Sequence, residues 1–204
     1  MSLEREEAGE LLAEALSNQN REFDVVLLTS LESFEIGREI ASRLNLPLNT
    51  LISRGLEVPG GDQVFGAVSE RDTIWIDDEK MRKTMIEEER VSKIKKDRLL
   101  EIKRSLNETG LEFKPELDSK NVLLVSEAIK SGLSEACSLG AALRAGADNR
   151  IMVSPSISEV GLEKMSLADE VICLERSSYS VNSNELLSRQ KKINQDKIKD
   201  YFRA

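Results

Sequence analysis

Histidine is absent from this chain of 204 residues, and its absence removes whole classes of catalytic site. No Ser-His-Asp or Cys-His arrangement can form within the chain. Only two cysteines occur, Cys137 and Cys173, with no CxxC spacing, which argues against a zinc site or a redox pair. Both lie in apolar segments, so we expect them to be buried packing residues. The remaining chemistry belongs to carboxylates, hydroxyls, backbone amides, lysine and arginine, together with an oxygen-coordinated ion such as Mg²⁺.

Long apolar runs are also missing, since no segment approaches the ~20 residues needed to cross a bilayer. The first ten residues, MSLEREEAGE, lack the basic-then-apolar pattern of a signal peptide. A net charge of -8 argues against nucleic acid or an anionic membrane as the main partner. With 40% hydrophobic and 32% charged residues, the composition predicts a soluble globular protein, which we expect to be cytoplasmic.

The GxGxxG and GxxxxGK[ST] motifs are absent, so dinucleotide-binding and P-loop interpretations have no support. What the sequence does contain is an alternation of apolar runs with helical patterns. The predicted strands cover residues 24–30, 49–54, 121–126, 149–154 and 169–175, with two short strands in GAVSE and TIWI. The predicted helices cover residues 4–16, 33–46 (with Ser33 as N-cap), 133–146 and 156–166. This alternation predicts an α/β fold with a doubly wound, mainly parallel sheet and helices on both faces.

The predicted organisation is a single domain over residues 1–204 with two helical appendages. A charged helical insertion is expected over 79–117, as one helix or two, packing as a lid or a dimer element. A helical tail is expected over 176–204. The pair Asp77-Asp78 is interpreted as a turn and a helix N-terminus, with Mg²⁺-dependent hydrolysis as the alternative.

The segment NVLLVSEAIKSGLSEA (121–136) is predicted to be a strand, a short polar loop and the start of a helix. Loops of this kind present several backbone N–H groups to an anion. Ser131 and Ser134 add hydroxyls, Gly132 permits a positive φ, Lys130 adds a cation, and Glu127 can accept hydrogen bonds from sugar hydroxyls. The alternative is that Ser131 or Ser134 simply caps the helix while Glu127 and Lys130 are exposed.

Several segments, in order along the chain, resemble the type I phosphoribosyltransferases, in particular a group of predicted bacterial and archaeal members. EREEAGELLAEAL (4–16) is similar to the family's DR-x-x-AG-x-x-LA opening, and VPGGDQVFGAVSE (58–70) to its PG-x-x-E-x-A-x-GAV-x-E segment. The closing ADEVICLE (168–175) is similar to ADEVVCL. NVLLVSEAIKSGLS (121–134) stands where the family has its loop for phosphoribosyl pyrophosphate (PRPP), V-[IL]-[LV]-V-DD-x-x-x-TG-x-T.

The resemblance implies a role for each residue of this loop. Glu127 takes the place of the acid that contacts the ribose and stabilises the oxocarbenium-like transition state, whereas Ser126 replaces the first acid of the pair. The implied binding loop for the 5-phosphate consists of Lys130, Ser131, Gly132, Leu133 and Ser134.

The pyrophosphate side departs further from the family. SLES (30–33) stands in place of PRGG and adds Glu32, a carboxylate that opposes pyrophosphate unless Mg²⁺ intervenes. Arg54 keeps one cation of the family's RK pair. We therefore predict a phosphoribosyltransferase-like protein that binds a 5'-phosphoribosyl or nucleoside monophosphate ligand, with transferase activity weak or lost. The alternative is an active, PRPP- and Mg²⁺-dependent transferase that joins ribose 5-phosphate to a nitrogen base. The resemblance also implies a homodimer, and the base would be selected by the N-terminal segment, the 55–70 loop or the helical insertion.

Overall fold

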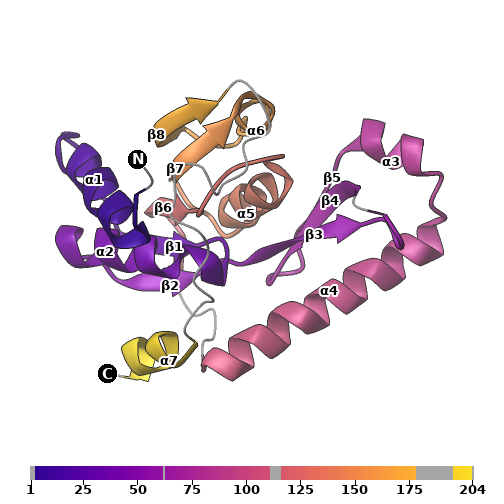
Figure 1. Ribbon diagram of the computed structural model, residues 1–204, viewed down its shortest axis with the longest axis horizontal. Helices are drawn as coiled ribbons and strands as arrows, with labels where there is room; N and C mark the ends of the chain where they lie inside the picture. The colour runs from indigo at the N-terminus through magenta and orange to yellow at the C-terminus, as the bar shows by residue number, and fades with distance from the viewer. Residues whose placement is uncertain (1–2, 62, 111–115, 178–194, 204) are drawn as a thin grey trace.

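The main sheet of the protein has five parallel strands in the order β2-β1-β6-β7-β8 (Figure 1). The computed structural model describes residues 3–61, 63–110, 116–177 and 195–203. The strands are β1 (Val25–Leu28), β2 (Leu48–Thr50), β6 (Asn121–Val125), β7 (Asn149–Ser158) and β8 (Glu170–Ser177). Each pair of neighbours in the sheet is parallel, which confirms the predicted α/β class.

Alternate side chains of the central strands pack on opposite faces of the sheet, because a strand has a side-chain period of two. On one face they pack against α1 (Arg5–Ser17) and α2 (Phe34–Leu44). On the other face they pack against α5 (Leu133–Arg144). Figure 1 shows these helices on the two sides of the sheet. The near-continuous burial of β1 and β6 follows from this double covering.

A second, antiparallel sheet consists of β3 (Ser53–Glu57), β4 (Val64–Ser69) and β5 (Ile74–Ile76). The sequence predicted one strand over 49–54, and the structure divides this stretch between β2 in the main sheet and β3 in the small one. The division falls at Ile52, whose N–H donates to the Glu70 carboxylate at 2.9 Å instead of to a strand. This crossing places the small sheet beside the carboxyl ends of the main strands.

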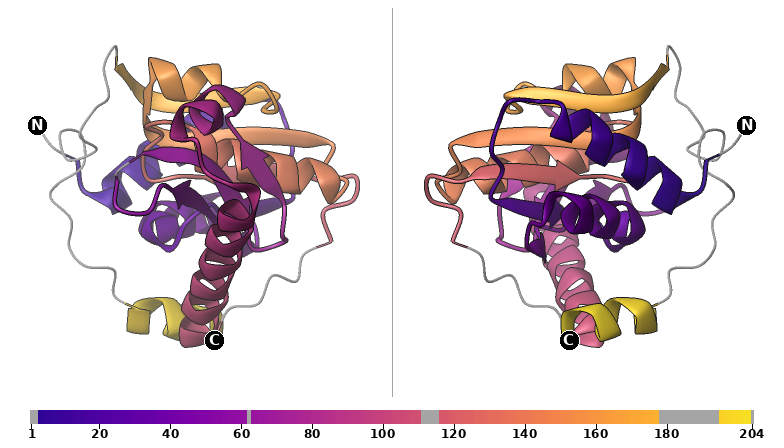
Figure 2. Two further views of the ribbon diagram at one scale, coloured as in Figure 1. Left: turned by 90° about the vertical axis from the view of Figure 1, so that its right-hand side faces the viewer. Right: turned by 90° about the vertical axis from the view of Figure 1, so that its left-hand side faces the viewer.

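The charged stretch after β5 forms two helices, α3 (Asp78–Thr84) and α4 (Glu88–Thr109). Ile102 and Leu106 of α4 are buried in the same core cluster as α1 and α2. The C-terminal helix α7 (Gln195–Arg203) buries Ile198 and lies beside the end of α4 in both views of Figure 2. Of the predicted 176–204 tail, residues 178–194 lie outside the described part of the chain.

The predicted helix over 156–166 is wrong at both ends. β7 continues to Ser158, and only α6 (Glu159–Glu163) is helical. The strand is extended because Ser156, Ile157 and Ser158 all pair with β8. The Ser158 hydroxyl then accepts a hydrogen bond from the N–H of Gly161 at 2.9 Å and so caps the short helix. Among the described residues, no helix is both long and apolar enough to span a membrane.

Candidate functional site

A groove of about 300 Å³ lies where β1, β2 and β6 end. Its lining comes from the stretches that follow these strands: Thr29, Ser30, Glu32, Ser53, Ser126, Glu127, Ala128, Lys130, Ser131, Ser134 and Glu135. The chain goes from β1 to β2 on one side and returns as β6 on the other, so the groove lies at the topological switch point of the sheet. In doubly wound folds this crevice is the usual place for a ligand.

The loop between β6 and α5 is fixed to β7 by backbone and side-chain contacts. Ile129 forms a parallel bridge with Ile157 of β7, and the carbonyl of Lys130 accepts a hydrogen bond from Ser158. Gly132 has φ +71°, and a Cβ added there would lie 2.7 Å from the carbonyl oxygen of Gly161. Glycine is therefore required by both conformation and space, which gives the predicted Gly132 a structural reason.

The end of this loop, from Lys130 to Ser134, contributes polar side chains to the groove. The N-cap residue of α5 is Gly132, without any side-chain cap, so the interpretation of Ser131 or Ser134 as a helix cap is wrong. Within the described ranges, neither serine hydroxyl makes a hydrogen bond, and no carboxylate pairs with the exposed Lys130. Leu133 also belongs to the predicted phosphate loop. Its side chain is buried, so only its backbone is available to a ligand. Ser131, Ser134 and Lys130 line the groove together, and their binding of a phosphate stays a prediction.

Glu127 also lines the groove, but its carboxylate already has a partner. One oxygen, Oε1, accepts hydrogen bonds from Nε of Arg5 at 2.8 Å and from Nη2 of the same side chain. Both side chains are largely buried, with exposed fractions of 11% for Arg5 and 15% for Glu127. Sequence reasoning missed Arg5, although it stands at the arginine of the family's DR opening. The N-terminus of α1 thus reaches the wall of the groove that contains Glu127.

A second carboxyl group, that of Glu135, lies beside Ser126 in the groove. The hydroxyl of Ser126 donates to Oε1 of Glu135 at 2.9 Å. Burial raises the pKa of Glu135, and the hydrogen bond from Ser126 opposes this shift in part. A carboxyl therefore lies beside position 126, supplied by the first turn of α5 instead of the end of β6.

The side of the groove formed by the stretch after β1 carries little positive charge among the described residues. Ser30 to Ser33 fold into a short 3-10 turn, η1 (Leu31–Ser33), and Glu32 lines the groove. Arg54 lies on β3, next to the groove-lining Ser53, and is not among the lining residues; its buried Nε has no hydrogen-bond partner in the described structure. No three acidic or cysteine side chains of the described residues come together as a metal site.

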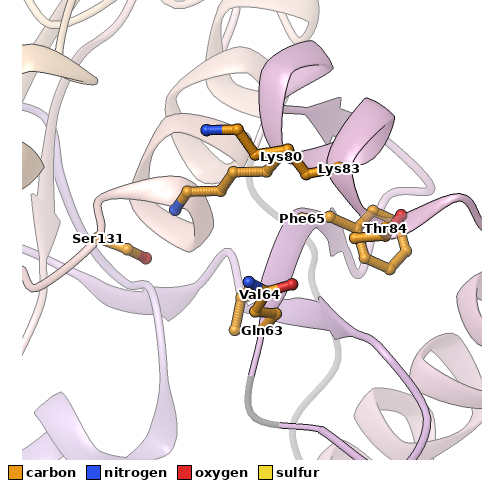
Figure 3. A pocket seen from close by; sticks show the side chains of 7 residues that line it. All are labelled: Gln63, Val64, Phe65, Lys80, Lys83, Thr84 and Ser131. Atoms are coloured by element: carbon orange, nitrogen blue, oxygen red, sulfur yellow. The ribbon is translucent and has the colours of Figure 1, made fainter.

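A second cavity, of about 410 Å³, adjoins the groove and shares Ser131 with it. Its other walls are Gln63, Val64 and Phe65 at the start of β4 and Lys80, Lys83 and Thr84 on α3 (Figure 3). Asp77 caps α3 by accepting from the N–H of Lys80 at 3.0 Å, and its other oxygen pairs with Lys164 at 2.8 Å. The interpretation of Asp77-Asp78 as a turn and a helix N-terminus is thereby confirmed.

The arrangement of a five-stranded parallel sheet, a small antiparallel sheet and a loop at the switch point is the type I phosphoribosyltransferase fold. Solved structures support this class. The protein TT1426 from Thermus thermophilus has a TM-score of 0.79 at 22% identity, with 98% of this chain and 97% of that chain covered. A purine phosphoribosyltransferase from Pyrococcus horikoshii has a TM-score of 0.52 at 14% identity, with 92% and 93% covered. A hypothetical protein from Neisseria gonorrhoeae with bound ppGpp has a TM-score of 0.57 at 13% identity, with 97% and 92% covered.

In sequence, the chain is 26% identical over 175 residues to a Mycobacterium tuberculosis H37Rv protein named "Putative phosphoribosyl transferase Rv0571c". The same values hold for MT0597, the protein of the same name in strain CDC 1551. The match covers 84% of this chain and 39% of each relative, so the chain spans about two fifths of their length. No protein-family model matches the chain.

Proposed function

We propose that the groove binds the 5-phosphate of a phosphoribosyl group, as in a nucleoside monophosphate, on the Lys130–Ser134 loop. The observation that carries this proposal is the pair of hydroxyls of Ser131 and Ser134, which lie in the groove without a protein partner in the described structure. They stand at the start of α5, where unpaired backbone N–H groups favour an anion. Lys130 adds a positive charge to the same wall. Glu127 would face the ribose.

We further propose that transfer from PRPP is weak or absent. Glu32 lines the groove on the side where pyrophosphate would lie, and like charges repel at short range. Glu127 is engaged by Arg5, so a ribose would have to share the carboxylate or displace the arginine. The alternative, an active transferase, is favoured by the position of Glu127 in the groove and by the names of the curated relatives. In that reaction a nitrogen base displaces pyrophosphate from PRPP.

Mg²⁺ belongs to the alternative rather than to the main proposal. The groove offers carboxylate oxygens, which Mg²⁺ prefers, but the described residues hold no cluster of three acids that would bind the ion without a ligand. Glu32 would be its protein ligand, and the ion would neutralise charge between this carboxylate and pyrophosphate. We also propose a homodimer in the cytoplasm, on the grounds of the family resemblance and the composition alone.

Isothermal titration calorimetry with UMP, GMP, pyrophosphate and PRPP, the last two with Mg²⁺, tests the proposal. We expect monophosphates to bind, and the double variant Ser131→Ala/Ser134→Ala to lose about a hundredfold in affinity, since each hydrogen bond to a charged group contributes about 1.5–3 kcal/mol. Ser92→Ala, on the exposed side of α4, is the matched control and should bind as the parent does. Unchanged affinity in the double variant would refute the phosphate loop.

The same ligands separate the two functions. If PRPP is consumed with a base, the alternative holds, and Glu127→Gln should then abolish turnover while the circular dichroism spectrum stays that of the parent. Monophosphate binding without pyrophosphate binding or turnover supports the main proposal.

A further inference from the structure

The second cavity is lined by two lysines, Lys80 and Lys83, that do not belong to the proposed phosphate loop. It lies between α3 and the loop, and its volume of about 410 Å³ is in the range of sites for small molecules. The fully buried Phe65, Gln63 and Thr84 are also among its lining residues, and the Thr84 hydroxyl donates to the carbonyl of Met81 at 2.7 Å. Ser131 lines both cavities, so they lie next to each other at this residue.

Two lysines give the cavity a positive charge. In Figure 3 the side chains of Lys80 and Lys83 extend from α3 toward the side on which Ser131 lies. The ammonium of Lys80 has no carboxylate within ion-pair distance among the described residues, and Asp77, the capping acid of α3, is bonded to Lys164. Lys83 pairs with Glu79 at 2.6 Å, but both side chains are well exposed, and such pairs contribute little. Both ammonium groups can therefore serve a ligand.

We propose that this cavity is an anion-selective subsite, so that the ligand carries two acidic groups. The 5-phosphate lies on the Lys130–Ser134 loop, as proposed above, and a second carboxylate or phosphate lies against Lys80 and Lys83. The substrate class is then a nucleotide with a further anionic group on its base or on its sugar. This inference rests on the proposed phosphate site, and it adds the requirement that the ligand carries a second acidic group.

Two matched pairs of ligands test the demand by calorimetry. Orotidine 5'-monophosphate and UMP differ by one carboxylate on the base, and guanosine 3',5'-bisphosphate and GMP differ by one phosphate on the sugar. In at least one pair we expect the more acidic member to bind about tenfold more tightly, as a charge-assisted hydrogen bond would give. Which pair shows the gain identifies where the second acid is carried.

Variants locate the subsite. Lys80→Gln is expected to reduce the tenfold preference to less than about twofold while the affinity for UMP and GMP stays unchanged. Lys103→Gln, which removes an exposed charge from α4, is the matched control and should keep the preference. Lys83→Gln should lower it in part.

Two results would overturn this inference: no preference in either pair, or equal weakening of both members of a pair by Lys80→Gln. Failure of the underlying function looks different, because it removes the binding of UMP and GMP themselves. If the monophosphates bind through Ser131 and Ser134 without any gain from the second acid, only the anionic subsite is refuted.

Discussion

The ion pair between Arg5 and Glu127 joins the N-terminus of α1 to the candidate loop, and its removal should be costly. Exposed pairs contribute less than about 1 kcal/mol, whereas removing one partner of a fully buried pair costs about 3–5 kcal/mol. With exposed fractions of 11% and 15%, this pair lies between the two limits. We therefore expect Arg5→Gln and Glu127→Gln each to lower the free energy of unfolding by about 2 kcal/mol.

Urea-induced unfolding, followed by fluorescence of the single tryptophan, Trp75, measures these changes. The double variant should lose less than the sum of the two single variants, by about 1–2 kcal/mol, because the second substitution removes a charge that has already lost its partner. Arg21→Gln is the matched control. It breaks the ion pair between Arg21 and Glu170, in which the two side chains are 40% and 36% exposed. The free energy of unfolding should fall by less than about 0.5 kcal/mol.

Strict additivity of the two substitutions would refute the reasoning, and so would single losses as small as that of the control. Either result would mean that Arg5 does not hold the Glu127 carboxylate in solution. The ribose side of the groove would then be open to a ligand without competition.

Two further predictions concern the fold around the site. Burial raises the pKa of Glu70 to about 7 from an ordinary 4.5, so the folded state holds this proton more tightly than the unfolded state. The stability that this group contributes is complete below pH 4.5 and is lost as the pH rises through 7. In urea titrations between pH 4.5 and 8, the free energy of unfolding of the parent should fall by up to about 3 kcal/mol relative to that of Glu70→Gln. A difference that stays constant over this pH range would contradict the prediction. Gly132→Ala should cost more than about 1 kcal/mol in the same assay because of its positive φ. Its close approach to Gly161 adds to that cost, so an unchanged midpoint would show that the loop adapts.

Most of the fold could be predicted from the sequence, because strands that are buried on both faces of a sheet appear as continuous apolar runs. The strands near Val25 and Val122 are continuous apolar runs, and such runs predict central parallel strands. The sequence-based prediction was wrong where pairing with another strand determines the local structure. Ser156 to Ser158 carry a helix-compatible pattern, yet they extend β7 because β8 supplies hydrogen-bonding partners.

The site divides in the same way. The place of Lys130 to Ser134 could be predicted because they lie in the short loop between an apolar strand and a helix, β6 and α5. Arg5 could not be derived from its neighbours, since its contact with Glu127 spans 122 positions. Glu135 was hidden for a related reason, because only the turn of the loop at Gly132 brings its carboxyl back to Ser126.

We propose that the distribution of charge around the groove, more than any single residue, favours binding over transfer. The phosphate end presents unpaired donors and Lys130, whereas the opposite end presents Glu32 and no groove-lining arginine among the described residues. A monophosphate places its charge only at the first end. PRPP would add pyrophosphate at the second, where each carboxylate–phosphate contact at ~4 Å opposes binding by up to about 4 kcal/mol at a surface-like dielectric constant of about 20. Unless Mg²⁺ offsets that repulsion, we expect the groove to bind a monophosphate and to discriminate against PRPP, as the proposed function requires.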